Sequence, residues 1–205
     1  MYRKYIKRVC DLVFAIALFP FVGAVIAIAG FLVWLEDRGP IFYNSKRVGR
    51  GGVFFIMYKL RTMKVNAPDI RNEDGSTFNS ATDPRLTKIG KLLRQTSIDE
   101  LPQIVNIVKG EMSFVGPRPE IPDEVLCYEA NDFRKLDVLP GITGYNQAFF
   151  RNTIPFKQRL KNDVYYVENV SFIFDVRVIL QTIIVCVGQR GIYSAQEGRA
   201  VDRER

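Results

Sequence analysis

The sequence predicts a mainly α-helical protein with one small β-hairpin, in which an N-terminal membrane helix precedes a cytoplasmic domain. An apolar run extends from Leu12 to Leu35, and later apolar residues recur at helical spacing. Two short strand-like segments around a glycine-rich turn predict the hairpin. We therefore expect a membrane-embedded helix in residues 1–37. A cytoplasmic α/β domain with interfacial amphipathic helices would form residues 38–205.

Pro20 lies inside the apolar run. As one helix the run would extend roughly 36 Å, enough to cross a hydrocarbon core of about 30 Å. Proline removes a backbone donor and clashes with the carbonyl four residues earlier, so we expect the helix to break at Pro20. Neither half would then cross the bilayer alone.

Basic residues flank both ends of this run. They are Arg3, Lys4, Lys7 and Arg8 before it, and Arg38, Lys46, Arg47 and Arg50 after it. Because cationic residues are normally held on the cytoplasmic side, both ends are expected there. This favours a re-entrant helix that dips into one leaflet, bends at Pro20 and returns; a kinked spanning helix is the alternative. No small-residue cleavage site follows the run, so we expect it to be retained rather than removed as a signal peptide.

The composition limits the possible partners and chemistry. The 205 residues carry a net charge of +7, which favours anionic phospholipids or phosphorylated ligands. The sequence has no zinc-finger spacing and no aromatic ribonucleoprotein motif, so nucleic acid is not expected as a partner. Histidine is absent, which leaves acid-base and covalent chemistry to other side chains. Three widely spaced cysteines indicate a reducing compartment.

The segments Pro40–Ser45 and Val53–Leu60 predict the two strands of the hairpin. Lys59 and Arg61 lie two residues apart, so both would face the same side and could bind an anion together. Their structural alternative is exposure to solvent or lipid headgroups. Downstream, residues 64–83 are polar and predict a loop, whereas residues 86–94 have the spacing of an amphipathic helix. Residues 176–187 are apolar but too short to span a bilayer, so they are expected to be buried or interfacial.

Two adjacent carboxylates, Asp99 and Glu100, follow Ser97. Ser97 and Glu100 match a capping box, which alone would give them a structural role. Alternatively, Asp99 lies at a helix start, where free amides favour an ionised carboxylate and attract phosphate. Glu100 would then hold a metal or move a proton. Neighbouring carboxylates also suit Mg²⁺, so Asp99 and Glu100 are candidate catalytic residues and metal ligands.

A second candidate site is the segment Gly116-Pro117-Arg118-Pro119. Prolines fix the backbone on both sides of Arg118, so its guanidinium would be held for a phosphate group at little entropic cost. The structural alternative is a rigid corner with an exposed arginine.

Six motifs occur in the order seen in a known family. They are Lys7-Arg8 with Asp11 before the apolar helix, Tyr58 to Met63, Asp83-Pro84-Arg85, Ser97 to Gln103, Met112 to Pro119, and Pro140 to Gly144. With them the chain resembles the monotopic phosphoglycosyl transferases, also called bacterial sugar transferases. The resemblance covers nearly the whole chain and is to the small form, a catalytic domain without an added N-terminal membrane bundle.

The resemblance implies transfer of a phospho-sugar from a UDP-sugar to a polyprenol phosphate, such as undecaprenyl phosphate, with release of UMP. This is the first membrane step of glycan assembly, at the cytoplasmic face of the bacterial inner membrane, by a monotopic enzyme. By similarity, Asp99 is the nucleophile that forms a covalent aspartyl intermediate, and Glu100 is its dyad partner.

Charge on the substrate phosphates must also be offset. With Mg²⁺, the residues Lys59, Arg61 and Arg118 are the candidates for this role. Asp163 falls in the family's C-terminal motif and is a further candidate active-site acid. After Gly144, the family's common Trp-Ala-Gln is replaced by Tyr145-Asn146-Gln147, which bears on sugar specificity more than on reaction class.

Two other functions remain open from the sequence. A UDP-sugar glycosyltransferase would transfer the sugar without its phosphate and release UDP. A non-enzymatic basic scaffold at the membrane would explain the charge but give Asp99 and Glu100 no special role. The sequence also leaves the sugar and a possible homo-oligomer undetermined.

Overall fold

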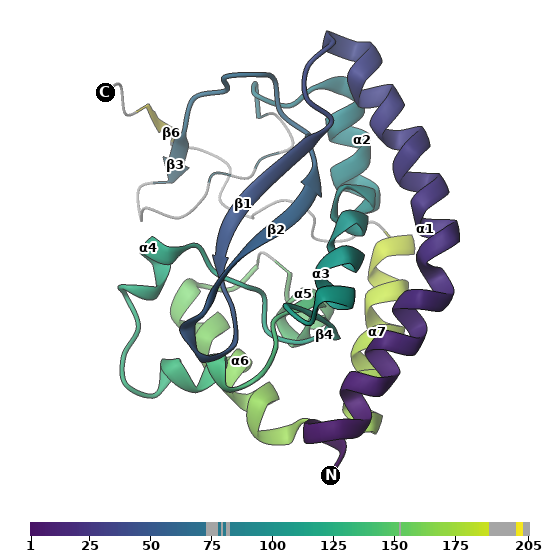
Figure 1. Ribbon diagram of the computed structural model, residues 1–205. Coiled ribbons are helices and arrows are strands. Elements are labelled where there is room, and N and C mark those ends of the chain that lie inside the picture. Colours follow the sequence, from purple (N-terminus) through teal and green to yellow (C-terminus); the bar gives the residue numbers. More distant parts are fainter. Residues whose placement is uncertain (73–77, 79, 81–82, 152, 189–199, 203–205) are drawn as a thin grey trace.

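The computed structural model describes residues 1–72, 78, 80, 83–151, 153–188 and 200–202 of the chain. It is mainly helical, as expected, with three two-stranded sheets among these residues (Figure 1). The helices are η1 (Tyr2–Ile6), α1 (Lys7–Asp37), η2 (Arg50–Gly52), α2 (Lys88–Thr96), η3 (Ile98–Gln103), α3 (Ile104–Lys109), α4 (Pro122–Val125), η4 (Asp132–Asp137), α5 (Tyr145–Phe149), α6 (Phe156–Asn169) and α7 (Phe172–Val187). The strands are β1 (Phe42–Val48), β2 (Phe54–Leu60), β3 (Ile70–Asn72), β4 (Ser113–Val115), β5 (Gly141–Thr143) and β6 (Ala200–Asp202).

The apolar run forms the single helix α1, which continues through Pro20. The prediction that Pro20 breaks this segment into two helices is therefore wrong. Proline removes only one backbone hydrogen bond, and the apolar residues on both sides continue to favour helix. By length and composition, the stretch Tyr2–Asp37 is long and apolar enough to cross a membrane.

One face of α1 packs against the rest of the molecule along the whole helix (Figure 1). Five of its six buried residues, Asp11, Ala15, Val22, Ala29 and Val33, fall within about 40° of one another at 100° per residue, on both sides of Pro20, and the sixth, Gly30, lies about 60° beyond them. Ala15 and Val22 belong to one core cluster, whose other buried members are Phe55, Met57, Ile104, Ile107 and Met112. Ala29 and Val33 belong to another, with Leu60 and Leu93. The helix thus lies along the domain rather than projecting away from it.

Both ends of α1 also bond to the domain. At its start, Arg8 donates to the carbonyl of Ile107 at 2.6 Å, and Lys7 pairs with Asp175 of α7. At its end, the Glu36 carboxylate accepts hydrogen bonds from the first two amides of α2, at 2.7 and 3.0 Å. Polar contacts therefore hold the two ends of the apolar helix to the same body.

The predicted hairpin is confirmed. β1 and β2 are antiparallel, with Tyr43 opposite Lys59, and β1 extends three residues beyond the predicted strand end. The turn contains Gly51 and Gly52 at φ values of 67° and 79°, a region that disfavours side chains. β2 packs against η3 and α3, which places Lys59 near the segment that follows α2 (Figure 1).

The short parallel pair β4–β5 brings two motifs together that lie far apart in the chain. The backbones touch: a Cβ on Gly116 would lie 2.4 Å from the carbonyl oxygen of Leu139, and one on Gly144 would lie 2.1 Å from that of Gly116. Only glycine permits this approach. The contact sets where Arg118 emerges from the domain.

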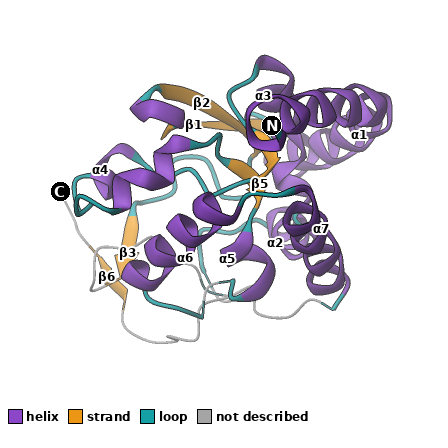
Figure 2. Cartoon of the chain, turned by 90° about the horizontal axis from the view of Figure 1, so that it is seen from below, coloured by secondary structure: helices purple, strands orange, loops and turns teal. Residues whose placement is uncertain are grey.

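The predicted interfacial segment near the C-terminus is α7. It is not a buried core helix: Val178 is fully buried, but many large apolar side chains are exposed, as on α1. The exposed large apolar residues of α7 are Phe172, Ile173, Val176, Ile179, Leu180, Ile183 and Ile184, and the charged Arg177 is exposed among them. Figures 1 and 2 both show α7 beside α1, and Tyr2 contacts Phe172 edge to face. Both α1 and α7 thus expose large apolar side chains, and their N-terminal ends lie beside each other.

The expected polar loop is present in part. It contains β3, which pairs with β6 in antiparallel fashion. Residues 73–77, 79, 81 and 82 of this stretch lie outside the described residues. The amphipathic helix expected next is α2, which begins after Thr87, whose hydroxyl accepts a hydrogen bond from the Gly90 amide at 2.9 Å.

Candidate active site

The acidic pair lies in η3, at the junction between α2 and α3. Ser97 does not form the predicted capping box: its side chain makes no cap hydrogen bond, and its φ is 58°. Its amide instead bonds back to the carbonyls of Arg94 and Leu93, which ends α2 in a left-handed cap. The left-handed Ser97 thus separates α2 from η3, and η3, which carries Asp99 and Glu100, packs against β2.

Lys59 and Arg118 converge on Glu100. The Lys59 Nζ lies 2.7 Å from the Glu100 Oε1, and the Arg118 Nη2 lies 3.0 Å from the same oxygen. The Asp99 Oδ2 is farther from Lys59, at 3.8 Å. Among the described residues, none donates a hydrogen bond to the Asp99 carboxylate. Four of the predicted site residues therefore meet, and both cations bind Glu100 more closely than Asp99. We call Asp99 the open carboxylate because it accepts no hydrogen bond from the described residues, although it is only 6% exposed.

This unequal pairing separates the two carboxyl groups electrostatically. Burial raises the pKa of Asp99 above its ordinary value, and the charge of Lys59 only partly opposes this effect. Burial also raises the pKa of Glu100, but the charges and hydrogen bonds of Arg118 and Lys59 outweigh it and hold that pKa well below its usual range. Glu100 is thus a fixed anion, and Asp99 is the carboxylate with spare capacity to accept a new partner.

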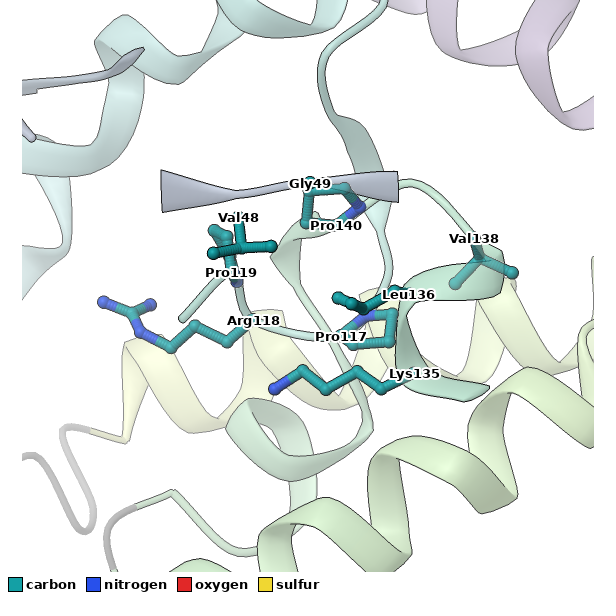
Figure 3. A pocket seen from close by; sticks show the side chains of 9 residues that line it. All are labelled: Val48, Gly49, Pro117, Arg118, Pro119, Lys135, Leu136, Val138 and Pro140. Carbon is teal, nitrogen blue, oxygen red and sulfur yellow. The ribbon is translucent and has the colours of Figure 1, made fainter. Parts of the chain in front are cut away.

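Arg118 is carried by the turn between β4 and Glu120. Arg118 lines the edge of a shallow hollow beside the hairpin turn, and its side chain extends away from that hollow (Figure 3). In Figure 3 the side chains of Arg118 and Lys135 extend in the same direction, yet they end at different carboxylates. Arg118 is still 41% exposed, so its remaining donors are accessible to a ligand.

The acidic pair has the donor chemistry to hold a Mg²⁺ ion, which would keep most of its water or phosphate ligands. No cluster of three or more Cys, Asp or Glu side chains able to hold a metal occurs among the described residues. Mg²⁺ commonly binds one or two carboxylates together with substrate phosphates, so a larger cluster is not required. The open carboxylate of Asp99 is the better ligand, because Glu100 already binds two cations.

Arg61 lies elsewhere. Its guanidinium forms a two-bond pair with Asp37 at the end of α1, with both N–O distances at 2.6 Å, and it also donates to the carbonyls of Pro40 and Met63. Lys59 and Arg61 therefore do not bind one anion together. Arg61 connects the end of β2 to the end of α1, and the structure does not bring it to the acidic pair.

Asp163 also lies apart from the acidic pair. It belongs to a buried cluster in which the Lys135 Nζ bonds the Glu120 Oε1 at 2.6 Å and the Asp163 Oδ2 at 2.8 Å. Asn146 donates to the other Asp163 oxygen at 2.7 Å. Because Asp163 is 2% exposed and fully bonded, it anchors α6 against the segment after Arg118.

Sequence reasoning overlooked Lys135 and Glu120. Lys135 lies in a strongly polar stretch, Asp132–Asp137, which has the composition of an exposed turn, yet it is 3% exposed. The only sequence signal was Glu120 directly after the Pro-Arg-Pro turn. Lys135 became recognisable once the fold brought Glu120 and Asp163 to either side of it.

The proteins to which this chain is similar are named as sugar transferases or sugar phosphotransferases. A family profile described as bacterial sugar transferase matches residues 2–189. The chain is 38% identical to the uncharacterized sugar transferase EpsL of Bacillus subtilis, covering 91% of this chain and 90% of that protein. It is 34% identical to the undecaprenyl-phosphate galactose phosphotransferase of Salmonella typhimurium, covering 93% of this chain.

An uncharacterized sugar transferase of Haemophilus influenzae is 38% identical over 93% of this chain. Relatives differ in length: the chain spans 42% of both the Salmonella and the Haemophilus proteins.

Proposed function

Because the chain belongs to the bacterial sugar transferase family, we propose that it transfers a phospho-sugar from a UDP-sugar to a polyprenol phosphate. Undecaprenyl phosphate is the acceptor suggested by the names of the relatives, for example the undecaprenyl-phosphate galactose phosphotransferase. The single observation that carries the proposal is the open Asp99 carboxylate beside a Glu100 that holds Lys59 and Arg118.

The proposed reaction has two displacements. First, an Asp99 oxygen attacks the sugar-proximal phosphorus, a bond forms between them, and the bond from that phosphorus to the UMP oxygen breaks. UMP leaves with the electron pair. Second, an oxygen of the polyprenol phosphate attacks the same phosphorus, the bond to Asp99 breaks, and the polyprenol diphosphate sugar departs. A carboxylate nucleophile is consistent with a chain that has no histidine.

The charged groups around Asp99 would bind the donor phosphates and neutralise their charge. Arg118, partly exposed and fixed between prolines, would bind a phosphate of the donor. Lys59 lies between both carboxylates, so it would neutralise charge as the Asp99 oxygen approaches the phosphorus. Mg²⁺ bound at Asp99 would supply further neutralisation of the diphosphate. Glu100 keeps both cations in position.

We also propose monotopic attachment at the cytoplasmic face of the inner membrane, with both ends of α1 on one side. The hydrogen bonds at each end of α1 and the packed stripe along it support this topology. The exposed faces of α1 and α7 would contact lipid. The Arg38 guanidinium, 4.0 Å from the Trp34 ring centre, fits a membrane-interface anchor. Labelling of single cysteines placed at positions 3 and 38 from the cytoplasmic side alone would test it.

The direct test of function is nucleotide release. Purified protein in nanodiscs is incubated with Mg²⁺, undecaprenyl phosphate and a panel of UDP-sugars, and the released nucleotide is identified. We expect UMP from the wild type, loss of UMP in Asp99→Asn, and retention in Asp137→Asn, an exposed control with the same chemical change. Release of UDP would instead indicate glycosyl transfer. Silence across the panel in folded protein would favour a basic membrane scaffold.

A further inference from the structure

Asn106 is fully buried on α3 and bonds to the outer edge of β2. Its Oδ1 accepts from the Tyr58 amide at 3.2 Å, and its Nδ2 donates to the Ile56 carbonyl at 2.7 Å. β2 pairs with β1 along its other edge, within the described residues. The Asn106 amide therefore satisfies one donor and one acceptor of β2 that a further strand would otherwise pair.

The third side-chain bond of Asn106 goes to Glu111, in the turn between α3 and β4. The Asn106 Nδ2 also donates to the Glu111 Oε2 at 2.7 Å. The backbone carbonyl of Asn106 accepts from the backbone amides of Glu111 and Met112, at 2.9 and 3.2 Å. The side chain is thus fixed by the turn that leads into β4. An amide is required here, because a carboxylate could accept from Tyr58 but would repel both the Ile56 carbonyl and Glu111.

These bonds fix β2 relative to the segment that carries the acidic pair. Lys59 directly follows Tyr58, and Asn106 lies six residues after Glu100 along the continuous helical segment formed by η3 and α3. The Lys59–Glu100 ion pair, at 2.7 Å, crosses the same contact between β2 and η3. A slip of β2 along α3 would move the Lys59 amine away from both carboxylates.

We infer that Asn106 is a positioning residue: its amide sets the register of β2 against α3 and so holds the Lys59 amine between Asp99 and Glu100. The consequence for catalysis rests on the proposed function. Asn106 itself lies too deep to touch a substrate. Its effect on the reaction travels through Lys59.

The first test measures the position of Lys59 without any substrate. An amine held in a close ion pair reacts slowly with an acylating reagent, so the rate of Lys59 modification, followed by mass spectrometry, reports on the Lys59–Glu100 contact. We expect Asn106→Asp to raise that rate severalfold. The matched control, Asn131→Asp, makes the same chemical change at an exposed residue and should leave the rate unchanged. An unchanged rate in Asn106→Asp overturns the inference.

The second test uses turnover in nanodiscs. Asn106→Asp should lower kcat about tenfold to a hundredfold, with a smaller change in KM for the UDP-sugar, because misplacing a charged group by about 1 Å can cost a hundredfold. In a Lys59→Met background the same substitution should cost less than about twofold. Equal losses in both backgrounds would mean that Asn106 does not act through Lys59, and would overturn the inference.

A variant that does not fold and a failure of the proposed function must each be distinguished from a failure of this inference. If Asn106→Asp does not fold, Asn106→Ser removes the amide without adding charge and replaces it in both tests. If the wild type releases no UMP, the proposed function fails, whereas Lys59 labelling still decides whether Asn106 positions that amine.

Discussion

Two clusters of carboxylates and cations lie on either side of the Pro-Arg-Pro turn, and they are paired in opposite ways. In the candidate active site, Lys59 and Arg118 share one carboxylate, Glu100, and Asp99 remains open. In the other cluster, Lys135 is shared by two carboxylates, those of Glu120 and Asp163.

The difference separates a reactive arrangement from an architectural one. In the second cluster the cation and both carboxylates are buried, so a ligand does not reach them, and removal of Lys135 leaves two uncompensated charges. Where two cations converge on one carboxylate, its neighbour keeps its lone pairs for chemistry. The same residue types thus serve stability in one place and are suited to catalysis in the other.

The largest expected effect tests which aspartate reacts. Asp99→Asn should lower UMP release at least about a thousandfold with little loss of stability, because the burial that raises the pKa of Asp99 also makes its charge costly. Asp163→Asn should retain turnover in the fraction that stays folded. Turnover and thermal unfolding of both variants check this. A folded but inactive Asp163→Asn would remove the distinction between the clusters.

The next effect concerns stability. Lys135→Met should destabilise the protein by about 3–5 kcal/mol, the usual cost of breaking a buried ion pair, since it leaves Glu120 and Asp163 unpaired. Lys59→Met, at the partly open site, should cost about 1 kcal/mol or less. Denaturant unfolding in detergent measures both. Similar losses in the two variants would show that the clusters are energetically alike.

A smaller effect distinguishes the two arginines. Arg118→Lys should lower kcat/KM about tenfold, because lysine lacks the planar set of donors that can bind Glu100 and a phosphate together. Arg61→Lys should leave kcat/KM within about threefold but lower stability, since it loses the two-bond pair with Asp37. A larger loss of kcat/KM in Arg61→Lys than in Arg118→Lys would indicate that Arg61 acts in the active site.

The smallest effect is a pH dependence in the architectural cluster. Burial and a hydrogen bond with Glu120 raise the pKa of Glu124 to about 7 from the ordinary 4.5. The folded state therefore holds this proton more tightly, and the Glu124 contribution to stability falls as pH rises from about 4.5 to 7. Glu124→Gln should stabilise the protein by about 1 kcal/mol at pH 8, reduced by partial exposure, and by nothing at pH 4. Unfolding at both pH values checks the sign.

Local patterns in the sequence predicted much of this molecule. The hairpin follows from two short strand-like segments around the glycine-rich turn, and α2 follows from helical spacing. Asp99, Glu100, Lys59 and Arg118 were selected as candidates, and the structure brings the four together. Their chemical roles remain predictions.

The failures concern partners that are distant in the chain. Arg61 was assigned to phosphate because it lies two residues after Lys59. Its actual partner, Asp37, is 24 residues earlier, and that pairing depends on how α1 lies on β2. Lys135 and Asp163 are buried only because α6 packs on the segment after Arg118. At Pro20, the local rule against proline was outweighed by the favourable residues on both sides of it. Pairing across the fold is set by packing, which a local pattern does not encode.

The most direct test of the open carboxylate is to capture the covalent intermediate. The protein is incubated with Mg²⁺ and its UDP-sugar without polyprenol phosphate, digested and analysed by mass spectrometry. We predict one phospho-sugar adduct, on Asp99, that disappears when polyprenol phosphate is added. An adduct on Glu100 or Asp163, or UMP release that requires the acceptor and leaves no adduct, would contradict the account.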